Sequence, residues 1–415
     1  MNQVDPILRE ISNYSPLDVM LADVAVRVQL TPTEHAQAEG HYHTLHDWLN
    51  RDESPLQGLV ENFYAQGGFA IGATTARHAD DADFDIDAMA QLSLQPTSDP
   101  EAVLDTLYKS IKGKPGSRYW EKTDRKTRCV TVLYEGSHLD ITPAVLAPER
   151  EERTSYIFHS KKLETGFDKK TLIANPYGFA EWFKARTMPD SAFGHFFERQ
   201  ALAYDWMRRE VLGADAEPVP EQAPAYRKSR AVIALQLLKR WRNIAYDARH
   251  PRYRLPPSVV LAHSVALNAN RTNSLSEELI HQATCLIVAL EKAESDRKTY
   301  DVWNPTCEGD DRLTDRWPED LRAQRIFIDE LRAFVADMER LQKGLPLSEI
   351  RKTLERLFGE RPANDAVRAF MDRHVRDNDS NRAVHIISTG SVPALGSLAT
   401  PALARPTPKS SPFGD

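Results

Sequence analysis

Two acidic segments restrict the fold of this 415-residue chain more than any other feature. The first is Asp85-Ile86-Asp87, and the second is Asp140 within His-Leu-Asp-Ile-Thr-Pro at positions 138–143. Successive side chains on a β-strand point to opposite faces, so Asp85 and Asp87 share one face while Ile86 points to the core. Asp140 lies between two apolar residues in the same way. The pattern predicts neighbouring strands whose three carboxylates gather on one face of a sheet.

Three clustered carboxylates require a cation to offset their mutual repulsion. Mg²⁺ suits them because it is a hard ion that binds carboxylate and phosphate oxygens together, and Mn²⁺ is the second cation that we expect to serve. An exposed acidic strand is the alternative, because an acidic run at 80–83 precedes the motif and would allow a register shifted by two residues. We expect Asp85 and Asp87 to be the ligands, because residues 86–90 resemble a buried strand and the preceding run resembles a loop.

A pair of glycines upstream predicts a phosphate-binding turn. Gly67 and Gly68 precede the acidic strand, and paired glycines allow the backbone to approach an anion and turn N–H groups toward it. Gln66, Thr74 and Thr75 lie close by as hydrogen-bond partners. A simple turn is the alternative. Phosphate binding beside a carboxylate–metal centre indicates nucleotidyl transfer, with nucleoside triphosphates as substrates.

Two further residues are candidates for binding the nucleotide. Lys239 lies on a mostly apolar helical segment, and a lysine that reaches past a core often serves an anionic ligand; a surface lysine is the alternative. Ser258 follows two prolines, and its hydroxyl would either donate to a phosphate or cap the next helix. The sequence alone favours the helix cap.

The first part of the chain predicts a mixed α/β lobe over residues 31–174, after an N-terminal segment at 1–30. The expected elements are a helix that a capping box opens at Thr31 and that runs to about Asn50, strands on either side of the glycine turn within 63–75 and 84–92, a helix after Asp99-Pro100, and a hairpin at 129–134 and 138–145 that presents Asp140. The first helix carries four histidines that are predicted to be surface residues rather than metal ligands: His35, His41, His43 and His46.

A mostly helical second lobe is predicted from residue 175 to 378. Its clearest helices are expected near 179–183 and at 227–245, 318–341 and 348–358, the last closed by Gly359. Residues 379–415 are rich in Ser, Pro, Gly, Ala and Thr, and such a segment cannot bury enough apolar surface to offset its ordering entropy. We therefore expect a flexible tail.

Composition argues against several classes of protein. The formal net charge of −7 argues against a protein that coats long nucleic acid, and a basic stretch at 109–128 is predicted to be solvated. The three cysteines show no metal-binding spacing and no disulfide framework. The sequence lacks a basic-then-apolar leader and an apolar run of about 20 residues. We expect a cytoplasmic protein with no membrane contact and no obligatory nucleic acid.

Taken together, the motifs resemble those of the cGAS/DncV-like nucleotidyltransferases, the CD-NTases of bacterial anti-phage (CBASS) systems, over residues from about 35 to 375. The resemblance rests on segments in one order: 66–69, 85–87 with Asp140, 238–242 with 257–258, and 303–317. It implies a polymerase β-like nucleotidyltransferase lobe plus a helical lobe, and metal-dependent synthesis of a cyclic di- or trinucleotide second messenger, with ATP among the substrates. Gly68 stands where the family usually has serine, so a hydroxyl contact to phosphate is missing; the backbone N–H contacts remain, and Thr74 and Thr75 are candidates to compensate.

The resemblance also assigns roles to the candidates. Its metal-binding triad corresponds to Asp85, Asp87 and Asp140, and its nucleotide contacts correspond to Gln66, Gly67, Gly68, Lys239 and Ser258. Related systems use ubiquitin-like conjugation enzymes or HORMA proteins as regulators, which predicts a partner for the tail, although Gly414 is followed by Asp415. Transfer to an RNA end or a protein, and a catalytically silent nucleotide sensor, stay open as alternatives. The bases, the linkage and the ring size are also open.

Overall fold

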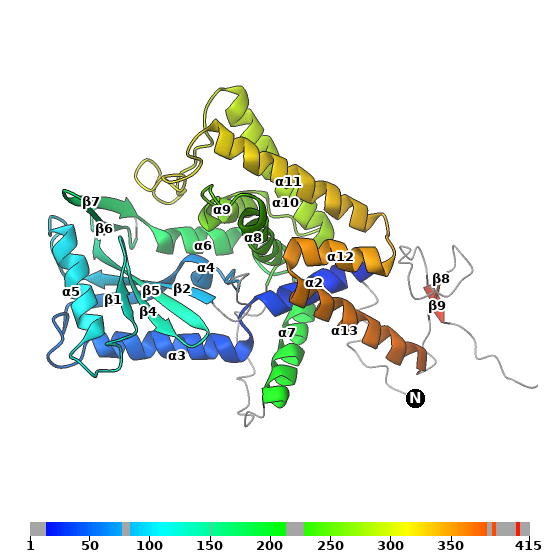
Figure 1. Cartoon of the computed structure of the whole chain (residues 1–415), viewed down its shortest axis with the longest axis horizontal. Helices are drawn as coiled ribbons and strands as arrows, with labels where there is room; N and C mark the ends of the chain where they lie inside the picture. The colour runs from blue at the N-terminus through cyan, green and yellow to red at the C-terminus, as the bar shows by residue number, and fades with distance from the viewer. Residues whose placement is uncertain are drawn as a thin grey trace, which may run out of the picture.

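The computed structural model describes residues 14–76, 84–150, 152–212 and 228–379, with two short segments at 384–386 and 404–406. A lobe built around a β-sheet is joined to a lobe of packed helices (Figure 1). The predicted fold class, a mixed sheet with helices plus a mostly helical part, is confirmed.

The main sheet of the described residues has seven strands. They are β1 (Val60–Gln66), β2 (Phe84–Leu92), β3 (Thr123–Arg125), β4 (Val130–Tyr134), β5 (Ser137–Leu146), β6 (Ser155–Leu163) and β7 (Gly166–Ala174). Their order is β1-β2-β5-β4-β3, and β6 pairs with both β5 and β7. Only β2 and β5 run parallel within this sheet, so their corresponding ends lie side by side. This pairing confirms the predicted neighbours.

Helices pack on the sheet and build the second lobe. They are α2 (Pro16–Val28), α3 (Pro32–Leu49), α4 (Gly67–Ala70), α5 (Pro100–Lys112), α6 (Pro176–Arg186), α7 (Ser191–Leu212), α8 (Arg230–Arg249), α9 (Ser258–Asn268), α10 (Leu275–Ser295), α11 (Leu321–Gln342), α12 (Leu347–Phe358) and α13 (Glu360–Asp379). The predicted capping box opens α3 through Thr31 and Glu34, and Asp99 caps α5. Gly359 ends α12 with a φ of 100°, as predicted.

Two hydrophobic cores underlie the two lobes. One lies between the sheet and helices α3 and α5, and includes Ile86, Leu139 and Ile141. The larger one lies among the helices and includes residues of α2, α8 and α11. Ala73, which follows the glycine turn, belongs to the helical core although it is close in sequence to the sheet. The segment after the glycines therefore connects the two cores.

Two predicted details differ from the structure. Helix α8 begins at Arg230 rather than at 227, because the hydroxyl of Ser229 caps it. Among the four histidines only His43 is exposed; His35 stacks on Phe69 and His41 on Tyr134.

The predicted flexible tail lies mostly outside the described residues. Within it, β8 (Val384–Ile386) pairs antiparallel with β9 (Ala404–Pro406). No helix among the described residues has the length and apolar character needed to span a bilayer.

Candidate active site

A cavity of about 690 Å³ lies between the sheet and the helical lobe. Its size is in the range of small-molecule sites. All eight predicted site residues line it: Gln66, Gly67, Gly68, Asp85, Asp87, Asp140, Lys239 and Ser258. The structure thus brings together residues that are up to 192 positions apart, from Gln66 to Ser258.

Asp87 and Asp140 lie directly opposite each other on the parallel strands β2 and β5. The hydroxyl of Thr131, which is opposite Asp140 on β4, donates a hydrogen bond to Asp140 Oδ1 at 2.5 Å. Two carboxylates therefore meet on neighbouring strands, and one of them is oriented by a fixed donor.

The electrostatics of Asp87 point to a cation. Burial, followed by the negative charges of Asp140 and Asp85, raises the pKa of Asp87 to about 7, and the ammonium group of Lys239 acts in the opposite direction. A divalent cation would offset this repulsion, and carboxylate oxygens are the donors that Mg²⁺ prefers. The donor chemistry of Asp87 and Asp140 therefore fits such an ion.

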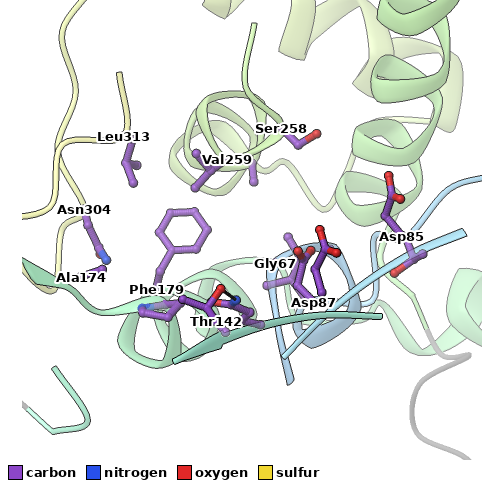
Figure 2. A pocket seen from close by; sticks show the side chains of 18 of the residues that line it. Gly67, Asp85, Asp87, Thr142, Ala174, Phe179, Ser258, Val259, Asn304 and Leu313 are labelled. Atoms are coloured by element: carbon purple, nitrogen blue, oxygen red, sulfur yellow. Dashed lines mark hydrogen bonds between the residues drawn. The ribbon is translucent and has the colours of Figure 1, made fainter. Parts of the chain in front are cut away.

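The predicted meeting of all three carboxylates is not seen. Figure 2 shows the carboxylate of Asp85 set apart from that of Asp87. Over the described part of the chain, no group of three or more His, Cys, Asp and Glu side chains is arranged to hold a metal ion. Strand alternation puts Asp85 on the correct face, but its side chain would have to turn about its own bonds to join the other two.

The glycine turn packs against the acidic strand. Gly67 has a φ of 59°, and a Cβ atom there would overlap the carboxylate of Asp87, so only glycine fits. Gln66 donates hydrogen bonds to the carbonyl of Ala88 at 3.2 Å and to the hydroxyl of Thr142 at 3.1 Å, which fixes the end of β1 against β2 and β5.

Lys239 is a buried residue rather than a surface lysine. Lys239 is only 9% exposed, and its Nζ donates a hydrogen bond to the carbonyl of Ala73 at 2.6 Å. Burial, with a contribution from Arg242, lowers the pKa of Lys239 to about 8, whereas Asp87 and Asp85 act in the opposite direction. In the described part of the protein this ammonium group hydrogen-bonds a neutral carbonyl and no carboxylate, and a buried charge of this kind is well suited to an anionic ligand.

Ser258 does not cap its helix. The N-cap position of α9 is Pro257, and the cap makes no side-chain hydrogen bond. The hydroxyl of Ser258 instead accepts from both terminal nitrogens of Arg242 at 3.3 Å. The interpretation that the sequence favoured is therefore wrong, and the hydroxyl lines the cavity (Figure 2).

Sequence reasoning missed several polar and aromatic residues of the cavity. They include Arg128, Phe179, Arg242, Asn304, Asp311 and Arg312. Asn304 donates to the carboxylate of Asp311 at 2.8 Å and to the carbonyl of Asn175 at 2.9 Å, which fixes one wall. The signals for them were the resemblance of residues 238–242, which include Arg242, the resemblance of residues 303–317, and the basic stretch that ends at Arg128.

Without metal and nucleotide, the protein should lose stability between pH 4 and pH 7 because of Asp87. An aspartate in the unfolded chain loses its proton near a pKa of about 3.9, whereas Asp87 in the folded protein keeps it up to a pKa of about 7. Between these two pKa values the unfolded state binds fewer protons than the folded state. The contribution of Asp87 to the free energy of unfolding therefore falls as pH rises to about 7 and is constant at higher pH. The measurement is the free energy of unfolding in EDTA, wild type minus Asp87→Asn. This difference should fall by up to about 4 kcal/mol over that range. A flat difference would contradict the prediction.

Comparison with known proteins shows which family model and which proteins this chain is similar to. Residues 18–186 match the family model of the Second Messenger Oligonucleotide or Dinucleotide Synthetase domain (SMODS). The cyclic dinucleotide synthase CdnG of Bradyrhizobium diazoefficiens is 35% identical over 391 residues, which are 93% of this chain and 91% of that protein. The structure of the Bradyrhizobium diazoefficiens CD-NTase CdnG in complex with GTP is 33% identical, with a TM-score of 0.74, and the match covers 86% of this chain and 99% of the other.

A more distant structure shares the fold. The E. coli MS115-1 CdnC:HORMA-deltaN complex matches with 13% identity and a TM-score of 0.52, over 85% of this chain and 96% of the other. The SMODS match and the 35% identity to CdnG point to the same kind of protein as the acidic residues, the glycine turn and the lysine that line the cavity. The chain therefore belongs to the cGAS/DncV-like nucleotidyltransferase family, the CD-NTases.

Proposed function

We propose that this chain is a metal-dependent nucleotidyltransferase that makes a cyclic di- or trinucleotide second messenger from nucleoside triphosphates. The single observation that carries the proposal is the facing pair Asp87 and Asp140 in one cavity with the buried Lys239. The similarity to CdnG, which is named a cyclic dinucleotide synthase, supports a dinucleotide as the main product, and the GTP complex of CdnG supports GTP beside ATP as a substrate.

The residues of the cavity have complementary roles in this proposal. Asp87, Asp140 and, after its side chain turns, Asp85 would hold Mg²⁺ or Mn²⁺, which supplies positive charge for the triphosphate and lowers the pKa of the attacking ribose hydroxyl. Asp140, which accepts a hydrogen bond from Thr131, would orient that hydroxyl or receive its proton. The hydroxyl oxygen bonds to the α-phosphorus, the bond from that phosphorus to the β-phosphate oxygen breaks, and pyrophosphate leaves.

Other residues would bind and orient the nucleotide. Lys239 would offset charge on the departing phosphates, and Gly67 and Gly68 would present backbone N–H groups to the phosphate oxygens. Ser258 would donate its hydroxyl while Arg242 holds it in place. The cavity would retain the linear intermediate for a second attack, which is a proximity effect.

The biological setting follows from the same proposal. A CD-NTase of this kind would act in the cytoplasm in anti-phage (CBASS) defence. A HORMA protein or a ubiquitin-like conjugation enzyme would regulate it through residues 379–415. The complex of CdnC with HORMA-deltaN supports the first kind of partner. Deletion of 380–415 that left regulation in cells unchanged would contradict the tail as the contact.

The test is incubation of the purified protein with four radiolabelled nucleoside triphosphates and Mg²⁺ or Mn²⁺, followed by phosphatase treatment and mass analysis. We expect a phosphatase-resistant small product whose mass gives the bases and ring size. Label that stays on RNA or protein would favour the macromolecular acceptor. Tight nucleotide binding with no turnover would favour the silent sensor.

A further inference from the structure

The glycine turn and the segment after it form one unit that spans both lobes. The N–H of Ala73 donates to the carbonyl of Gly68 at 2.8 Å, which closes the turn on itself. The N–H of Ala76 donates to the carbonyl of Val28 at 2.8 Å, at the end of α2 in the helical lobe. Residues 67–76 are therefore held at both ends, and their position depends on the helical lobe as well as on the sheet.

Side chains of helix α8 hold this segment in place by donating hydrogen bonds to the carbonyl groups of residues 73–76. Gln236 Nε2 donates to the carbonyl of Thr74 at 2.9 Å, and Arg240 Nη1 donates to that of Ala76 at 3.3 Å. Lys239 bonds the carbonyl of Ala73 between them. Positions 236, 239 and 240 lie on one face of the helix because they are three and four residues apart. Gln236 is fully buried, so Thr74 has a fixed place in the cavity wall.

The hydroxyl of Thr74 has no hydrogen-bond partner within the described part of the protein. Thr74 lines the cavity and is only 6% exposed. Its Oγ1 is covered, and no described residue gives it a hydrogen bond. A buried hydroxyl without a partner is unfavourable, so such a group in a ligand cavity is explained most simply by a partner that the ligand supplies. Threonine can exchange its methyl and hydroxyl positions by one rotation about χ1.

Gly68 lacks a side chain, and a hydroxyl-bearing side chain at this position would lie beside Thr74. A Cβ atom on Gly68 would lie 3.6 Å from the carbonyl carbon of Ala73, which is bonded to the nitrogen of Thr74. It would also lie 3.2 Å from Lys239 Nζ, the end of a flexible side chain. Gly68 itself offers no hydroxyl at this point, which is next to the ammonium group expected to meet the phosphates.

We propose that Thr74 is a nucleotide-binding residue whose hydroxyl donates to a phosphate oxygen of the bound triphosphate, and that Gln236 is the positioning residue that holds it. The inference rests on the proposed function, because it takes the cavity to bind a nucleoside triphosphate. It assigns to Thr74 the hydroxyl contact that Gly68 cannot make. It also makes the position of a phosphate contact depend on the helical lobe.

The test compares three variants with the wild type in equilibrium dialysis of GTP and of ATP, each with Mg²⁺. Thr74→Val removes only the hydroxyl and should weaken binding about tenfold or more, because a hydrogen bond to a charged group is lost. Thr74→Ser keeps the hydroxyl and should restore most of the affinity. Thr154→Val is the matched control, since Thr154 is also buried and its hydroxyl also lacks a partner among the described residues, but it does not line this cavity. It should bind as the wild type does.

A second measurement separates binding from a structural role. Gly68→Ser introduced into Thr74→Val should recover part of the affinity, because the new hydroxyl lies beside the lost one. Melting temperatures should show that Thr74→Val is folded. Wild-type affinity in Thr74→Val would overturn the inference and leave the proposed function standing. A wild-type protein that binds neither nucleotide would overturn both.

Discussion

Replacing Asp87 with asparagine is expected to lower the rate of product formation by about 10³-fold or more, because the carboxylate opposite Asp140 is lost. The fold should remain intact. In EDTA at pH 8 the variant should be more stable than the wild type, because a buried carboxylate that repels Asp140 and Asp85 has been replaced by a neutral group of the same shape. The measurements are product yield by chromatography and the melting temperature with and without Mg²⁺.

The control for this variant is Asp124→Asn. Asp124 lies on β3 of the same sheet, is paired with Lys126 and does not line the cavity. This change should leave product formation and the response to Mg²⁺ near those of the wild type. If Asp87→Asn kept a rate within about tenfold of the wild type, the assignment of Asp87 to the reacting centre would be wrong.

Local patterns predicted the elements that carry the acidic residues. The predicted strand at 84–92 has the bounds of β2, in which apolar and acidic residues alternate over 84–87, and the pairing of β2 with β5 confirms that Asp87 and Asp140 are neighbours. Helix α2 was missed because its apolar residues surround the helix instead of following one face, as in an element buried on all sides. A segment that lacks a polar face gives no period to detect.

The arrangement of side chains could not be predicted in the same way. Strand alternation places Asp85 on the correct face but does not determine its rotamer, and Figure 2 shows its carboxylate apart from that of Asp87. The partner of Ser258 is Arg242, and this contact depends on how two helices pack. Asp311 reaches the cavity through its bonds with Asn304 and with the backbone N–H of residue 175, across more than 130 positions. Such contacts depend on tertiary structure that no local pattern encodes.

The second large effect concerns the two buried lysines near the glycine turn. Lys239→Met is expected to raise the KM for nucleoside triphosphates by about 10- to 100-fold, because a charged hydrogen bond to phosphate is worth about 1.5–3 kcal/mol. Burial lowers the pKa of Lys239 to about 8, so its ammonium group carries its full burial cost at pH 7 and this cost is relieved as pH rises through 8. The variant should therefore be at least as stable as the wild type without nucleotide.

Lys228→Met provides the matched control for that experiment. Lys228 is 9% exposed, as Lys239 is, and burial lowers its pKa to about 7, but it bonds Gln29 and does not line the cavity. Both variants remove a buried amino group, which at pH 7 is mostly charged in Lys239 and about half charged in Lys228. Both should therefore keep or gain melting temperature, and only Lys239→Met should raise KM. A similar rise of KM in both variants would mean that the lysines act through the general charge of this region. A rise confined to Lys239→Met, with added nucleotide no longer increasing the melting temperature, would identify a direct contact between this ammonium group and the triphosphate.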